Sequence, residues 1–139
     1  MFRNILIAYD GSEHSRKAAQ IAGDLARMQS ETDLWLVCVL EPIPSELGHP
    51  YVDHIITQRK QMGDELLQKA RGLIGENVII HDELLFGSPA ESILDMSRNL
   101  KIDLIIIGTR GLSGLRGLLL GSQINKVISL SECPVLAIK

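Results

Sequence analysis

Residues 4–12 read NILIAYDGS and join a continuous apolar run to a turn and a helix-capping serine. The run lacks the polar alternation of a half-exposed strand, so it predicts a strand over Asn4–Tyr9 that is buried on both faces. Asp10-Gly11 is a common turn sequence, and Ser12 is a preferred residue at a helix N-terminus. A doubly buried strand that runs straight into a helix indicates a parallel sheet covered by helices.

The alternation of strand and helix continues along the whole chain. Further strands are predicted over Asp33–Leu40, Val78–Leu85, Asp103–Ile107 and Val135–Ile138. Helices are predicted after Ser12, over Tyr51–Leu73, from Ser88 to Leu100 and over Gln123–Leu130. We therefore expect a single doubly wound α/β domain over residues 1–139, with five parallel strands and helices on both faces. In such folds ligands bind beyond the carboxyl ends of the strands, at the switch point in strand order.

Helical periodicity predicts the buried side of each of these helices. In the first, apolar residues recur at Ala18, Ile21, Ala22, Leu25 and Met28. In the second, the stripe consists of Ile55, Met62, Leu66, Leu67 and Ala70. Ser88-Pro89-Ala90-Glu91 predicts a helix start with serine as N-cap, proline at the first position and a capping box with Glu91.

Composition excludes several classes of function. Of the 139 residues, 45% are hydrophobic and 22% charged, which is ordinary for a soluble globular protein. A net charge of −3 without a long basic run argues against a nucleic-acid surface, and no apolar run approaches a membrane-spanning length. The start, MFRNILIAYDG, lacks the pattern of a signal peptide, so we expect a cytoplasmic protein. Cys38 and Cys133 lie in apolar context and are predicted to be buried, reduced thiols.

The stretch GTRGLSGLRGLLLGS, Gly108–Ser122, follows a strand and precedes a helix. Glycines let backbone amides approach a ligand, and a helix N-terminus attracts anions, so this stretch can form a phosphate cradle. The alternative is that the glycines only permit a tight turn and close packing. Neither a P-loop nor a dinucleotide-binding glycine motif is present. Asp10 could meet a ribose hydroxyl or a metal bound to phosphates, or could only stabilise the helix start.

The glycine spacing resembles that of a known family. Gly108-x-x-Gly111, nine residues and then Gly121-Ser122 match the G-2x-G-9x-G-[S/T] signature of ATP-binding universal stress proteins. The resemblance covers the whole chain, through NILIAYDGSEHS, GSPAESIL, DLIIIGTRG and CPVLAIK. It implies a Rossmann-like fold with strand order 3-2-1-4-5 that binds ATP, with Mg²⁺ or Mn²⁺ held through the phosphates.

The resemblance also implies a role for each matching residue. Ala8 and Val39 would wall the adenine, and Asp10 would meet the ribose or the metal-phosphate end. Ribose and phosphates would be lined by Gly108, Thr109, Arg110 and Gly111. The triphosphate would be held by Gly121, Ser122 and Gln123. The family has a smaller residue at the position of Gln123, so only the backbone amide of Gln123 is expected to take part. Arg110 is equally compatible with an exposed position in solvent.

Three hypotheses for function remain open. The first is a nucleotide-dependent sensor or regulatory module in the stress response, read by an unknown partner protein. The second is a slow ATPase or phosphotransferase. Efficient phosphoryl transfer needs a cation and a base; the glycine-rich stretch contains no lysine, and the motifs of the chain offer Asp10 as the acidic group. The third is a nucleotide-free dimeric interaction module.

The four histidines lack metal-site spacing, and His14 is expected to be a solvated residue in the first helical turn.

The terminal strand indicates how the chain assembles. Val135–Lys139 reads VLAIK, a short apolar segment predicted at a sheet edge, where it can pair with another chain. The resemblance implies a homodimer in which this strand pairs antiparallel with its two-fold mate. The alternative is a monomer in which Lys139 blocks the edge. The proline-rich loop Glu41–Pro50 is a further candidate for a lid or a partner surface.

Overall fold

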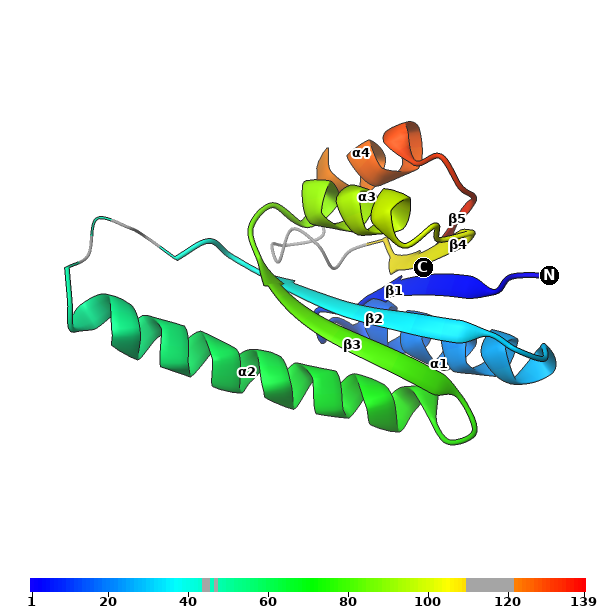
Figure 1. Ribbon diagram of the computed structural model, residues 1–139, viewed down its shortest axis with the longest axis horizontal. Coiled ribbons are helices and arrows are strands. Elements are labelled where there is room, and N and C mark those ends of the chain that lie inside the picture. Colours follow the sequence, from blue (N-terminus) through cyan, green and yellow to red (C-terminus); the bar gives the residue numbers. More distant parts are fainter. Residues whose placement is uncertain (44–45, 47, 110–121) are drawn as a thin grey trace.

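The computed structural model describes residues 1–43, 46, 48–109 and 122–139, in which strands and helices alternate (Figure 1). The strands are β1 (Asn4–Ala8), β2 (Asp33–Leu40), β3 (Ile79–Phe86), β4 (Leu104–Gly108) and β5 (Val135–Ile138). The helices are α1 (Glu13–Met28), α2 (Tyr51–Ile74), α3 (Pro89–Asn99) and α4 (Ser122–Leu130). Each predicted element is therefore present, with ends that differ from the prediction by a residue or two.

The strands form one parallel sheet in the order β3-β2-β1-β4-β5. This confirms the predicted fold class and strand order. The chain first builds the sheet from β1 toward β3 and then returns to add β4 on the other side of β1. The switch point therefore lies between β1 and β4, where the crossovers leave in opposite directions.

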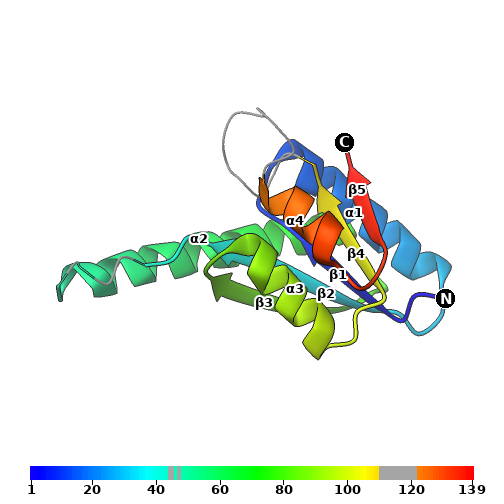
Figure 2. The same ribbon diagram turned by 90° about the horizontal axis from the view of Figure 1, so that it is seen from above.

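Two helical layers cover the sheet (Figures 1 and 2). Ile5 and Ile7 of β1 face the layer of α1 and α2, whereas Leu6 and Ala8 face the layer of α3 and α4. All four side chains are buried, as are those of β4. Each fully buried large aliphatic side chain contributes about 1.5–3 kcal/mol, so two-sided burial makes these central strands the core of the domain.

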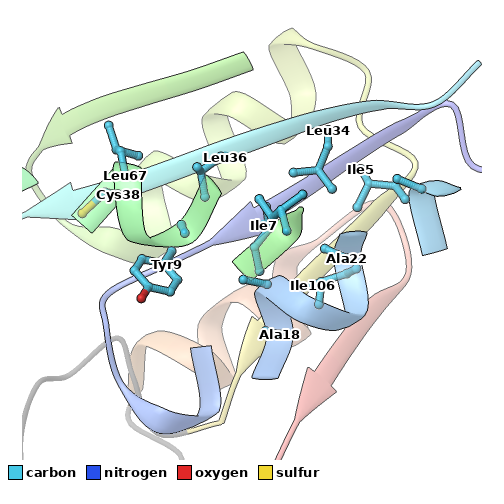
Figure 3. Close-up of a cluster of buried hydrophobic side chains, with 14 of the residues drawn as sticks. Ile5, Ile7, Tyr9, Ala18, Ala22, Leu34, Leu36, Cys38, Leu67 and Ile106 are labelled. Carbon is cyan, nitrogen blue, oxygen red and sulfur yellow. The ribbon is translucent and has the colours of Figure 1, made fainter. Parts of the chain in front are cut away.

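The buried face of α1 consists of small residues, which corrects the predicted stripe. Met28 is 81% exposed, and the residues that face the core are Ser15, Ala18, Ala19, Ala22, Gly23 and Ala26. Small side chains allow the helix to approach the sheet closely, which a face of larger residues would prevent. Figure 3 shows Ala18 and Ala22 directly against the aliphatic side chains of the sheet.

Helix α2 buries Gly63, Leu67, Ala70 and Ile74, which lie on one side at helical spacing. Met62, predicted to be part of this stripe, is 49% exposed because it lies one position away from that face. The first half of α2 extends beyond the carboxyl ends of the strands (Figures 1 and 2). Only the second half packs against the sheet, where Leu67, Ala70 and Ile74 join the core.

Both helix starts have the predicted serine as N-cap residue, but only one has the predicted capping bond. Ser12 is the N-cap of α1, and its hydroxyl accepts a hydrogen bond from the Ser15 amide at 3.2 Å. Pro89 occupies the predicted first position of α3, but the Ser88 side chain makes no capping bond there. The predicted capping box is therefore wrong. Glu91 instead forms an ion pair with Lys126 of α4, with 3.3 Å between Oε1 and Nζ.

Both cysteines are free thiols in different environments. Cys38 is 1% exposed, and its burial raises the pKa of the thiol to about 11. Cys133 is half-buried rather than buried, because it lies in the turn before β5 beside Ser97 and Ser131. None of the described helices is long and apolar enough to cross a membrane.

Candidate functional site

The switch point brings the ends of β1 and β4 together. These neighbouring strands pair in parallel register, with Ile7 opposite Ile106. Asp10 therefore follows β1 close to the place where Thr109 follows β4. Two residues that lie far apart in the sequence thus reach one edge of the sheet.

Asp10 has a structural role at this edge. It is half-buried, and one carboxylate oxygen accepts the Ser12 amide at 2.9 Å, which stabilises the turn into α1. Its own amide donates to the Ser15 hydroxyl at 3.4 Å. The described residues hold no group of three or more histidine, cysteine or acidic side chains for a metal. A lone carboxylate fits Mg²⁺ only when phosphate oxygens and water complete the coordination, so Asp10 matches a nucleotide-bound metal and not an all-protein site.

Thr109 is joined to the start of α1 by a hydrogen bond. Its side-chain oxygen lies 2.9 Å from Nδ1 of His14, and its amide donates to the Ile138 carbonyl at 2.8 Å. Thr109 is 8% exposed and His14 is half-buried, so the expectation of a solvated His14 is wrong. The bond connects the first turn of α1 with the end of β4 across the switch point.

Gly108 is in close contact with the same turn of α1. A Cβ atom at this position would lie 2.7 Å from both the His14 carbonyl carbon and the Ser15 amide nitrogen. Because real Cβ atoms do not approach backbone so closely, the glycine is required for α1 to pack on the end of β4. Close packing, which was the alternative to a phosphate cradle, accounts for this one glycine of the signature.

The residues predicted to wall an adenine lie on the face of the sheet that α3 and α4 cover, opposite the face against which α1 packs. Ala8 is 3% exposed and belongs to the cluster beneath α3 and α4. Val39 is half-buried and packs against the same cluster, two residues beyond Val37, the register partner of Ala8. The structure thus places both side chains on one face at the carboxyl end of the sheet.

Gln123 links the starts of α3 and α4. Its side-chain oxygen Oε1 accepts the Ala90 amide at 3.0 Å and the Ser88 hydroxyl at 3.3 Å. The glutamine thereby supplies the α3 cap that Ser88 was predicted to make. Its side chain is occupied by this contact, so any role in phosphate binding belongs to its backbone amide. Since α4 begins at Ser122, that amide lies in the first turn of the helix, where amide groups lack partners within the helix.

Replacing Gln123 by alanine is expected to lower the free energy of unfolding by about 1 kcal/mol, the usual cost of a lost N-cap. The Ala90 amide would lose its acceptor in a buried position. Gln123→Glu keeps a side-chain oxygen at the same place and adds a negative charge near a helix N-terminus, so it should be at least as stable as the wild type at pH 7. Urea denaturation of the three proteins measures the difference. Equal stability of Gln123→Ala and the wild type would show that the cap contributes nothing.

The remaining predicted contacts fall in the glycine-rich stretch. Arg110, Gly111 and Gly121 lie outside the described residues, as does the side chain of Ser122. Their roles stay predictions. His14 and Ser88 were not among the predicted site residues, since their partners Thr109 and Gln123 are 95 and 35 positions away in the sequence.

The arrangement defines a class of protein: a doubly wound α/β domain whose polar residues gather at the β1–β4 switch point. Residues 1–139 match the Universal stress protein family. The "Universal stress protein in QAH/OAS sulfhydrylase 3'region" of Thermus aquaticus is 40% identical over 140 residues, which cover all of both chains. The chain belongs to the universal stress protein family.

Solved structures have the same fold. The hypothetical protein MJ0577 superposes with a TM-score of 0.84 at 24% identity, over 100% of this chain and 96% of that one. A universal stress protein in complex with cAMP gives a TM-score of 0.72 at 23% identity, covering 99% and 97% of the two chains. A universal stress protein from Archaeoglobus fulgidus in complex with dAMP gives 0.71 at 23% identity, covering 100% and 98%.

Proposed function

We propose that this universal stress protein binds ATP at the β1–β4 switch point and acts as a nucleotide-dependent regulatory module. The observation that carries the proposal is that Asp10 and Thr109 follow the neighbouring strands β1 and β4 at one edge of the sheet, while the first turn of α4 contacts the start of α3. This edge is where doubly wound folds bind ligands, and a helix N-terminus favours phosphate. The glycine spacing of residues 108–121 and the cAMP and dAMP complexes of similar folds support an adenine nucleotide.

Different residues would contact the metal, the base and the phosphates of the nucleotide. A metal bound through the phosphates would neutralise their charge, and Asp10 would provide its one protein carboxylate. Ala8 and Val39 would offer an apolar surface to the base, and the first amides of α4 would donate to phosphate oxygens. The Thr109 hydroxyl, which is hydrogen-bonded to His14, would lie at the ribose and phosphate end of the nucleotide.

The contacts of the site suggest how a partner protein would detect a bound nucleotide. His14 in the first turn of α1 is hydrogen-bonded to Thr109, and Gln123 in the first turn of α4 accepts a hydrogen bond from Ala90 of α3. A nucleotide that contacts Thr109 and the first amides of α4 would therefore change which positions of the two helix starts are populated. A partner protein that contacts either helix would sense the bound state.

Asp10→Asn is expected to weaken ATP binding about tenfold in the presence of Mg²⁺, a loss of roughly 1.4 kcal/mol. Asparagine retains an oxygen that can accept the Ser12 amide, so the turn into α1 is kept while the metal loses its carboxylate. In EDTA the two proteins should bind ATP alike. Isothermal titration calorimetry measures both conditions, and Asp95→Asn, an exposed aspartate of α3, is the matched control. Binding by Asp10→Asn at wild-type affinity with Mg²⁺ would refute the metal role, and no ATP binding by the wild type would refute the proposed function.

We further propose a homodimer through β5. This strand is an edge of the sheet, paired with β4 on one side. Large apolar side chains are exposed on β5 and on α4, which precedes it in the chain: Leu136 at 37%, Ile128 at 45% and Leu130 at 55%. An uncovered parallel edge next to exposed aliphatic side chains favours pairing with a second copy of the chain.

A further inference from the structure

A cavity of about 430 Å³ opens between the start of α1 and the second half of α2. Its walls include Tyr9, Arg16, Leu66, Lys69, Gly72 and Leu73. Tyr9 belongs to the core on the α1–α2 face, whereas Ala8 and Val39 belong to the α3–α4 face. The cavity therefore lies on the side of the sheet opposite the predicted adenine wall. Its volume falls within the roughly 300–1,000 Å³ of small-molecule pockets.

The charged side chains of this cavity are both basic. Arg16 comes from α1 and Lys69 from α2, and neither forms an ion pair with any residue that the structure describes. No acidic residue is among the described residues that line the cavity. Two cations from separate helices, neither ion-paired within the described part of a chain of net charge −3, make this a local positive site that is suited to an anion.

Tyr9 adds a polar group to the same wall. The residue is 2% exposed, and Figure 3 shows its ring at the edge of the core with the oxygen directed away from the labelled aliphatic side chains. Within the described ranges no hydrogen bond involves its hydroxyl. Burial raises the pKa of Tyr9; the charge of Arg16 lowers it, whereas Asp10 and Cys38 raise it further. The hydroxyl is thus a neutral donor in a cavity that Arg16 also lines.

Gly72 keeps the wall of the cavity open. Glycine within a helix is about 1 kcal/mol less favourable than alanine. At Gly63 a close contact explains the glycine, because a Cβ atom would collide with the Leu84 side chain. At Gly72 a Cβ atom would meet nothing within 4 Å, so packing does not require a glycine there. The missing side chain leaves open space beside Gly72, which lines the cavity.

We propose that this cavity binds a small organic anion, with the carboxylate or phosphate group on Arg16, Lys69 and the Tyr9 hydroxyl. The apolar part of the ligand would lie against Leu66 and Leu73, which pack on the core from α2. This is a second site, which goes beyond nucleotide binding because it uses the opposite face of the sheet and none of the predicted nucleotide contacts.

The fluorescent anion 8-anilinonaphthalene-1-sulfonate combines one negative charge with an apolar body and is the probe for a titration of the full chain. Saturable binding is expected, with displacement by octanoate or octyl phosphate but not by octanol or Mg²⁺-ATP. Stronger displacement by octanoate assigns a carboxylate ligand, and stronger displacement by octyl phosphate assigns a phosphate ester. Displacement of the probe by Mg²⁺-ATP would overturn the assignment of a separate site.

Variants locate the bound probe. Gly72→Leu fills the cavity from a helical position with free space, so probe affinity should fall at least tenfold while the melting temperature stays the same or rises. Arg16→Gln combined with Lys69→Gln should cause a similar loss. Lys60→Gln, an exposed lysine of α2 outside the cavity, is the control and should bind like the wild type. Wild-type affinity in folded Gly72→Leu would overturn the proposal.

Discussion

Gly108→Ala is expected to lower the free energy of unfolding by about 2–3 kcal/mol, although it adds a single methyl group. The new Cβ atom would lie 2.7 Å from backbone atoms of His14 and Ser15. Neither atom belongs to a flexible side chain, so the first turn of α1 must move away from β4. The movement would also lengthen the hydrogen bond between His14 and Thr109. Because whole domains have stabilities of roughly 5–15 kcal/mol, the loss is large.

Chemical denaturation monitored by circular dichroism measures this loss. Gly48→Ala is the matched control, since a Cβ atom at Gly48 meets nothing within 4 Å, and its stability should stay within about 0.5 kcal/mol of the wild type. If Gly108→Ala were as stable as the wild type, α1 would not be packed against the end of β4 as described. The same variant also separates two roles of this glycine, because its ATP affinity can be measured under conditions in which it is folded.

Ala137→Pro is expected to convert the proposed homodimer into a monomer, with dimerisation weakened at least about 100-fold. The Pro134 and Ile138 carbonyls bond to β4, at 3.0 Å from the Ile105 amide and 2.8 Å from the Thr109 amide. Since successive residues of a strand alternate in direction, the amide and carbonyl of Ala137 point to the free edge. Proline removes that donor and obstructs the edge while the pairing with β4 remains.

Light scattering at micromolar concentration distinguishes the mass of two chains from that of one. Ala137→Val keeps the backbone donor and serves as the control that should remain dimeric. Circular dichroism establishes that both variants are folded. A folded Ala137→Pro protein with the mass of a dimer would exclude β5 pairing as the mode of assembly.

The fold could be predicted because its signals are local. The central strands, including Ile5–Ala8 and Leu104–Ile107, are continuous apolar runs, and two-sided burial follows from that pattern alone. Parallel strands need helical crossovers, so alternation of strand and helix fixed the architecture. The buried face of α1 was predicted only in part, because it depends on the sheet that the helix packs against. In α1 the sequence offers large residues such as Met28 on one side and alanines on another, and the sheet selects the alanines because they allow close approach.

The candidate site was predicted only in part. Glycine spacing located the stretch 108–122, and the end of β1 located Asp10, since both are readable along the chain. The contacts that fix the site are not. The bond between His14 and Thr109 spans 95 positions, and that between Gln123 and Ala90 spans 33. No local pattern reports which side chains meet at such separations.

The sequence by itself determined the class of fold, the order of elements and the residues that follow each strand, because hydrophobic periodicity, helix caps and turns act over a few residues. The tertiary structure decided which of those residues meet. It made Gln123 and not Ser88 the acceptor of the capping hydrogen bond of α3, packed Gly108 against α1, and placed Arg16 and Lys69 around one cavity. The physical reason is that these outcomes depend on distances between elements, which the packing of helices on the twisted sheet sets and the local sequence does not encode.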